Sequence, residues 1–139
     1  MICIDANIWV YYFDSRADEH GSVRPQMVDA LENRRPFCNT AIQMEVVHFF
    51  ANQFEDTRRY VDRLLGFEDL AVADLVIEDV KRAKELLVSH PHAGIGGRDA
   101  SLVASMERRG VSELWTHDQG LKRLDGRLGW LTVKDPVAA

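Results

Sequence analysis

The chain has 139 residues, and its 46% hydrophobic and 28% charged residues are typical of one folded domain and exclude a disordered chain. No apolar run is long enough to cross a bilayer, and no basic stretch precedes an apolar one at the start. We therefore expect one cytosolic domain over residues 1–139 with no membrane partner. The net charge of −5 disfavours a simple basic nucleic-acid binder, but carboxylates gathered around a metal cation would give the same balance.

Short apolar runs alternate with longer segments of helical period, a pattern typical of an α/β fold with a mainly parallel sheet. The runs predict about five strands, at Ile2–Asp5, Pro36–Asn39, Leu70–Ala73, Glu113–Thr116 and Trp130–Val133. The periodic segments predict helices at Ala6–Phe13, Val23–Asn33, Thr40–Asn52, Asp56–Leu65, Ile77–Ser89, Asp99–Arg109 and Gln119–Leu124. Thr40 followed by Gln43 predicts a capping box, and Gly110 stands where a left-handed residue would end a helix.

Four acidic residues stand where an isolated carboxylate is costly. Asp5 ends the first apolar strand, and Asp118 follows the fourth strand two residues after Thr116, whose hydroxyl could orient it. Glu45 lies beside apolar neighbours on its helix, and Asp99 shares the inward side of another helix. Taken alone, Asp5 and Asp118 are explained as N-caps, Asp99 as a helix-dipole partner and Glu45 as a rim residue.

Taken together, the four acids favour a metal site. Ligand sites of open α/β sheets lie beyond the carboxyl ends of the strands, where these residues gather. Converging carboxylates cannot all stay ionised in water-poor surroundings without a cation. Ligation by oxygen alone selects hard ions, so we expect Mg²⁺ or Mn²⁺, in a site of the kind that most often acts on phosphates.

Other metal chemistries fit the sequence less well. Cys3 and Cys38 lie in apolar segments without a second Cys or His at ligand spacing, which favours two reduced, buried thiols over a zinc site. Glu45 and His48 form the Glu-x-x-His pair of di-iron bundles, but those bundles need a second copy, which this chain lacks.

Four short segments carry the acids: Asp5-Ala6-Asn7, Gln43-Met44-Glu45-Val46, Arg98-Asp99-Ala100-Ser101-Leu102-Val103-Ala104 and Thr116-His117-Asp118. This ordered set, which spans essentially the whole chain, resembles the signature of PIN domains. A lone domain of this size is similar to VapC-type toxins of type II toxin–antitoxin pairs. Two positions depart from the family pattern, since Leu121 stands where Phe is common and Gly120 where another acid is common. The loss of that acid weakens the case for a second metal ion.

The resemblance implies a three-layer α/β/α domain that acts as a Mg²⁺- or Mn²⁺-dependent endoribonuclease on RNA, forms a homodimer and is neutralised by a cognate antitoxin protein. It implies catalytic and metal-binding roles for Asp5, Glu45, Asp99 and Asp118, with Asn7 and Thr116 as supporting residues. We expect the three aspartates to hold the metal and Glu45 to complete the outer shell or orient the attacking water.

Features outside the acids predict the surfaces. Clusters of basic residues, explained as solvated helix faces or as a rim that attracts RNA phosphates, occur at Arg58, Arg59, Arg63, Arg108, Arg109, Lys122, Arg123 and Arg127. The aromatic run Trp9–Phe13 is expected to form a dimer or antitoxin interface. Arg98 is the one obvious intrachain cation near the acids, so we expect a basic residue of the antitoxin to neutralise the pocket. His117 should point away from Asp118 in an extended segment and is not expected to be catalytic.

Two other functions fit parts of the pattern. One is a non-catalytic PIN-like module that binds RNA or protein, which would have little reason to carry four mutually repelling acids. The other is a phosphatase of the haloacid-dehalogenase type with Asp5 as nucleophile. That chemistry usually has a second Asp where Asn7 stands and lacks the helical Glu45.

Overall fold

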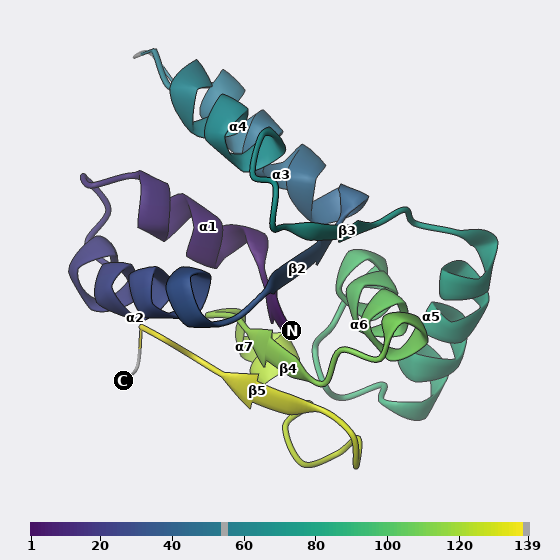
Figure 1. Cartoon of the computed structure of the whole chain (residues 1–139). Helices are drawn as coiled ribbons and strands as arrows, with labels where there is room; N and C mark the ends of the chain where they lie inside the picture. Colours follow the sequence, from purple (N-terminus) through teal and green to yellow (C-terminus); the bar gives the residue numbers. More distant parts are fainter. Residues whose placement is uncertain (54–55, 138–139) are drawn as a thin grey trace.

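The computed structural model describes residues 1–53 and 56–137, and these contain one five-stranded sheet in which all neighbouring strands are parallel (Figure 1). The strands are β1 (Ile2–Ile4), β2 (Pro36–Asn39), β3 (Ala71–Ala73), β4 (Glu113–Trp115) and β5 (Thr132–Lys134), in the spatial order β3-β2-β1-β4-β5. The prediction of a parallel α/β sheet is confirmed, and each strand lies within two residues of its expected bounds.

The helices of the described part of the chain are α1 (Ala6–Phe13), α2 (His20–Asn33), α3 (Thr40–Ala51), α4 (Arg58–Leu65), α5 (Ile77–Ser89), α6 (Gly97–Arg109) and α7 (Gln119–Lys122). Helices α1 and α2 lie on one side of the sheet and α5 and α6 on the other, which gives three layers (Figure 1). Helices α3 and α4 pack together and extend away from the β2–β3 end of the sheet. Within the described residues, no helix combines the length and apolar character needed to span a bilayer.

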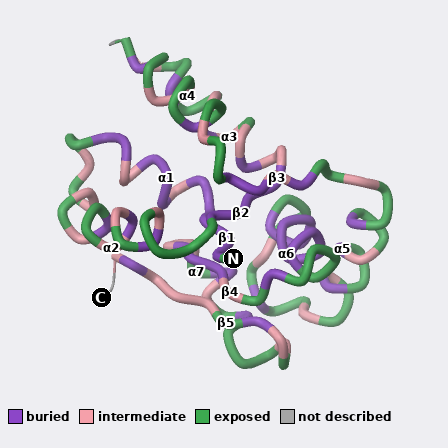
Figure 2. The backbone as a smooth tube through the Cα atoms, viewed as in Figure 1, coloured by how far each residue is buried: buried purple, intermediate pink, exposed green. Residues whose placement is uncertain are grey.

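The central strand β1 is buried along its whole length, between two parallel neighbours and beneath helices (Figure 2). Cys3 is in register with Phe37 of β2 and with Leu114 of β4. Both cysteines are buried free thiols, as predicted, and burial raises the pKa of Cys38 to about 12. Because the strands are parallel, the residues that follow β1, β2 and β4 emerge at the same edge of the sheet.

Two residues of the aromatic run after β1 belong to the core, which corrects the interface prediction for them, whereas Tyr11 and Tyr12 are half-buried. Trp9 and Phe13 are 1% and 6% exposed, and their stacked rings lie 5.8 Å apart. Phe13 also stacks on Tyr60 of α4 at 5.8 Å. The four-residue spacing puts Trp9 and Phe13 on the inward side of α1, so a partner protein cannot reach them.

Helix starts are the least accurate part of the prediction. Helix α2 begins at His20, three residues before the expected Val23. Helix α3 is capped by Asn39, whose Oδ1 accepts a hydrogen bond from Ile42 N at 2.9 Å, so the predicted capping box beginning at Thr40 is wrong. The Thr40 hydroxyl instead accepts a hydrogen bond from the backbone of the segment after β3. Asn39 and Thr40 are both good N-cap residues, and the sequence pattern alone does not show which of them caps the helix.

A buried ion pair joins α5 to α6. The Asp79 side chain is 1% exposed and accepts hydrogen bonds from Arg108 Nε at 2.8 Å and Nη2 at 3.0 Å. Its Oδ2 also accepts one from Val76 N at 3.2 Å at the start of α5. Burial alone favours the protonated carboxyl, but the contacts with Arg108 and Val76 outweigh it and lower the pKa of Asp79. This pair and the exposed Arg82–Glu107 pair therefore connect the two helices on this side of the sheet.

Asp79→Ala should lower the free energy of unfolding by about 3 kcal/mol, because Arg108 loses its bidentate partner. The pKa of Asp79 is lowered from its ordinary value of 3.8. The contribution of the pair should therefore be full at neutral pH and be lost as the pH falls through the folded-state pKa. Urea unfolding of variant and parent should therefore give free energies of unfolding that differ less at pH 3 than at pH 7. Glu85→Ala removes an exposed partner of Arg82 and should cost less than about 1 kcal/mol; equal losses in the two variants would contradict the assignment.

Candidate functional site

The first and fourth acids are linked through one threonine. Asp5 directly follows β1, is 2% exposed and caps α1 through an Oδ1 that accepts a hydrogen bond from Ala6 N at 2.8 Å. Its Oδ2 accepts a hydrogen bond from the Thr116 hydroxyl at 2.7 Å. Thr116 Oγ1 in turn accepts one from the backbone N of Asp118 at 3.0 Å. Thr116 therefore orients the Asp5 carboxylate directly. The sequence predicted that its hydroxyl orients the Asp118 side chain, but in the structure it contacts only the Asp118 main chain.

The turn between β4 and α7 carries Asp118 and is braced from α1. The Asp118 carboxylate accepts a hydrogen bond from Leu121 N at 2.9 Å and so caps α7. Asn7 Oδ1 accepts one from His117 N at 3.4 Å. The supporting residue Asn7 therefore contacts the main chain beside Asp118 in this structure and holds the turn in place.

The second and third acids are linked through one arginine. Glu45 lies on α3 with its side chain 35% exposed, and Asp99 lies in the first turn of α6 with its side chain 11% exposed. Arg98 pairs through Nη1 with Glu45 Oε2 and through Nη2 with Asp99 Oδ1, the latter at 2.9 Å. Asp99 Oδ2 accepts a hydrogen bond from Gly96 N at 3.4 Å. Glu45 is at the rim of the buried face of α3, since its neighbour Phe49 is also 42% exposed.

Repulsion connects the four acids pair by pair, from Glu45 and Asp5 through Asp99 to Asp118. Burial raises the pKa of Asp5, Glu45 and Asp99 above the ordinary values, and the positive charge of Arg98 opposes the rise in each case. The negative charges of Asp5 and Asp99 further raise the pKa of Glu45, and that of Asp118 raises the pKa of Asp99. The carboxylates that the sequence singled out therefore form one repelling group at the carboxyl edge of the sheet.

The simpler explanations also hold for three of the acids. Asp5, Asp99 and Asp118 each accept a backbone N–H at the start of a helix. A carboxylate has about four lone-pair sites, so capping leaves others free for a ligand and the two roles do not exclude each other. Glu45 lies within α3, where no backbone N–H needs a cap. Its position near Asp5 and Asp99 has no capping explanation.

The donor atoms suit a hard divalent cation, because all of them are carboxylate oxygens. As the side chains now lie, however, no three Asp, Glu, His or Cys residues of the described ranges 1–53 and 56–137 come close enough together to hold a metal ion. The Arg98 guanidinium supplies the positive charge between Glu45 and Asp99. The chemistry of the site therefore fits Mg²⁺ or Mn²⁺, while the observed arrangement is an arginine-bridged one.

Gly120, where an acid is common in PIN domains, has a steric reason to be glycine. A Cβ built there would lie 2.4 Å from the Gly94 carbonyl oxygen and 3.2 Å from Asp118 Oδ1. Gly94 has a φ of +78°, and a Cβ on it would meet the Arg123 guanidinium at 2.8 Å. The loop before α6 thus closes directly on α7. Any side chain at position 120 would displace that loop or Asp118 in this structure, which explains the glycine in this chain.

A second charged cluster, which sequence reasoning missed, lies at the end of β5. The Asp135 side chain is 5% exposed, and its Oδ2 lies 2.9 Å from His117 Nδ1 and 2.6 Å from Lys122 Nζ. The available signal was an acid two residues after the last expected strand, which ends at Val133. His117 is thus paired with a structural carboxylate. Lys122, like Arg108, has an intrachain partner, so the basic rim is smaller than the sequence suggests.

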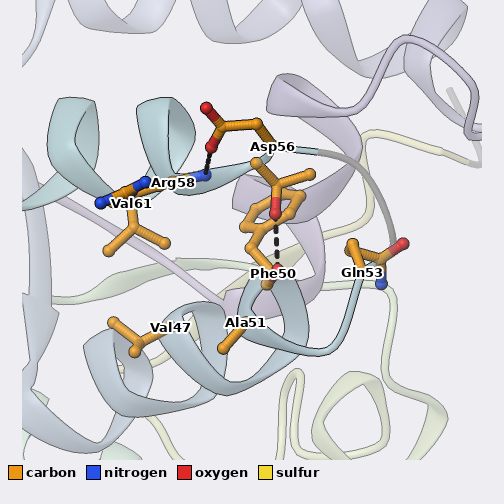
Figure 3. Close-up of a pocket in the computed structure, with 8 residues that line it drawn as sticks. Val47, Phe50, Ala51, Gln53, Asp56, Arg58 and Val61 are labelled. Carbon is orange, nitrogen blue, oxygen red and sulfur yellow. Dashed lines mark hydrogen bonds between the residues drawn. The ribbon is translucent and has the colours of Figure 1, made fainter.

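A hollow of about 320 Å³ lies between α3 and α4, and none of the four acids lines it (Figure 3). Its wall is mostly apolar and includes Val47 and Val61. The Thr57 hydroxyl at the wall donates a hydrogen bond to the Phe50 carbonyl oxygen at 2.5 Å. This hollow brings no reactive group together, so the carboxylate edge remains the candidate site.

Comparisons with known proteins bear on the family and the fold. The PIN domain family model matches residues 2–127, whereas no curated protein matches the sequence significantly. The solved structure of VapBC2 from Rickettsia felis, bound to a promoter DNA fragment, is 17% identical with a TM-score of 0.69 and covers 97% of this chain and 98% of that chain. Mycobacterium tuberculosis VapC20, a toxin that cleaves the sarcin–ricin loop, is 15% identical with a TM-score of 0.73, over 94% and 97% of the two chains. FitAcB from Neisseria gonorrhoeae is 15% identical with a TM-score of 0.68, over 98% of each chain.

At these identities the solved structures establish a shared fold, and this fold is the three-layer arrangement predicted from the sequence. The family model adds the sequence evidence, because it spans all four acids in order. The chain belongs to the PIN domain family.

Proposed function

We propose that this protein is a metal-dependent endoribonuclease that hydrolyses RNA phosphodiester bonds and acts as the toxin of a toxin–antitoxin pair. The observation that carries the proposal is the approach of four acids, from β1, α3, α6 and the turn after β4, to one edge of a PIN domain. Similarity to a toxin that cleaves the sarcin–ricin loop supports RNA as the substrate.

In this proposal Asp5, Asp99 and Asp118 hold Mg²⁺ or Mn²⁺, and Glu45 completes the outer shell or orients the attacking water. When bound, the cation supplies a Lewis acid that lowers the pKa of water and stabilises the charge of an in-line displacement. The protein contributes fixed carboxylates: Asp5 is held by Ala6 N and the Thr116 hydroxyl. Such preorganisation lowers the reorganisation that accompanies reaction.

The second part of the proposal is a cognate antitoxin that binds over the acids in the cytosol. The similar solved structures include toxin–antitoxin complexes, among them one from Klebsiella pneumoniae. The site already accommodates one guanidinium, that of Arg98, between two carboxylates. An arginine of the antitoxin would find the same kind of partner at the half-buried Asp118.

Replacing this antitoxin arginine by alanine should weaken inhibition of RNA cleavage. Excess Mn²⁺ should partly compete with the antitoxin for the site.

We also propose a homodimer. Exposed apolar side chains on or next to α5 include Leu75, Val80 and Val88, at 41%, 53% and 74% exposure. Leu75 and Val80 line a largely apolar hollow of about 470 Å³. Apolar surface of this kind is typical of contact with another protein. Light scattering should give twice the mass of the chain, and Val80→Asp should reduce it; a monomeric parent would contradict this part of the proposal.

The alternative is a non-catalytic PIN-like module that binds RNA or protein. The observation that favours it is the arginine bridge, because no three of the described acids are preassembled as a metal cage. The alternative predicts RNA binding that neither chelation nor added metal changes, and no cleavage products. Cleavage that EDTA abolishes and Mn²⁺ restores would exclude it.

Asp5→Asn should fold normally and lose about a hundredfold or more of the RNA cleavage rate. Burial raises the pKa of Asp5, so the ionised carboxylate is unfavourable in the metal-free protein and its neutral isostere should melt at the same temperature or higher. Cleavage of a labelled RNA and thermal melting without metal measure the two effects. A variant that cleaves as fast as the parent would refute the role of Asp5.

Mn²⁺ should raise the melting temperature of the parent, because the folded site binds the ion and the unfolded chain hardly does. At a hundred times the dissociation constant, the shift should be about 8–10 °C for a domain of this size. Asp99→Asn should lose most of it, whereas Asp74→Asn, outside the site, should keep it. No shift in the parent, or equal shifts in parent and Asp99→Asn, would contradict a metal site at these residues.

A further inference from the structure

Arg98 is the residue on which the arrangement of Glu45 and Asp99 depends. Its two terminal nitrogens contact separate carboxylates, one on α3 and one on α6. The positive charge of Arg98 also opposes the pKa rise of Asp5, with which the structure records no direct contact. One guanidinium thus offsets part of the repulsion among three of the four acids, which is the task that a bound cation would otherwise perform.

The same contacts compete with a metal ion for its ligands. A divalent cation such as Mg²⁺ needs carboxylate oxygens at about 2.1 Å. The Arg98 fork already takes lone pairs of Glu45 Oε2 and Asp99 Oδ1, which are then less available to the cation. A second positive charge at this short range also disfavours the cation electrostatically. The absence of three assembled ligands among the described residues agrees with this competition.

The Arg98 side chain can move from the carboxylates into solvent. It is 43% exposed, so water can solvate its guanidinium when it leaves the carboxylates. Its backbone stays fixed, since the Ser101 hydroxyl donates a hydrogen bond to the Arg98 carbonyl oxygen at 2.7 Å. The side chain can therefore leave the carboxylates by rotation about its own bonds while α6 and Asp99 keep their place.

We propose that Arg98 is a built-in counterion that holds Glu45 and Asp99 together in the metal-free protein and must swing away for the cation to bind, so that it sets the metal affinity of the site. This inference rests on the metal site of the proposed function. It assigns Arg98 as a positioning residue that acts through two carboxylates. Removing it should destabilise the metal-free protein and tighten metal binding, two opposite effects that a purely structural salt bridge would not produce together.

The experiment is a calorimetric titration of chelator-treated protein with Mn²⁺, together with thermal melting before and after metal addition. Arg98→Gln should bind Mn²⁺ about fivefold more tightly than the parent and melt lower without metal. Arg98→Lys keeps the charge but cannot bridge two carboxylates with one planar fork, so its affinity should lie between those of the parent and Arg98→Gln. Arg82→Gln is the matched control, because Arg82 also bridges two carboxylates, Glu85 and Glu107, on the α5–α6 surface.

The outcomes separate this inference from the proposed function. If the parent binds Mn²⁺ and Arg98→Gln binds it equally or more weakly, the inference is overturned while the metal site stands. If Arg98→Lys matches the parent, charge alone sets the affinity and the bridging role is overturned. If Arg82→Gln tightens Mn²⁺ binding as much as Arg98→Gln does, the effect is not local and the inference fails. If neither the parent nor Arg98→Gln binds Mn²⁺, the metal site itself is refuted.

Discussion

The repulsion among four carboxylates at one edge of a parallel sheet is the constraint around which this molecule is arranged. Two of them, Asp5 and Asp99, are largely buried, where an ionised group is most costly. Part of that cost is offset by hydrogen bonds from backbone N–H groups and from Thr116, and part by the charge of Arg98. Apolar residues at these positions would cost less free energy, and we therefore propose that the acids serve a ligand of opposite charge.

The rest of the fold positions this edge. Parallel strands bring residues that are distant in sequence to the same side, and the buried register of β1 with β2 and β4 fixes where Asp5 and Thr116 emerge. The Asp79–Arg108 pair joins α6, which carries Asp99, to α5. The contact of Gly120 with Gly94 closes the loop before α6 on α7. The apolar packing of the strands and the Asp79–Arg108 pair between α5 and α6 thus hold the charged residues of this edge in position.

Much of this was predictable from the sequence, because apolar runs and helical periods determine the elements and the sheet topology gathers the acids. Contacts between residues far apart in sequence were not. The burial of Trp9 and Phe13 depends on α4, and the capping of α3 by Asn39 depends on Thr40 being engaged by the segment after β3. The bridge from Arg98 to Glu45 joins α6 to α3, and no local pattern encodes it. Asp135 was missed because its partners lie on another element.

We propose that the four acids form a metal site in which Arg98 bridges Glu45 and Asp99 when no metal is bound. Anomalous diffraction from crystals grown with Mn²⁺ tests it most directly. The account predicts one peak bounded by oxygens of Asp5, Asp99 and Asp118 at about 2.1 Å, with the Arg98 side chain moved away from Glu45. No peak at this edge with Arg98 still bridging Glu45 and Asp99 would contradict it.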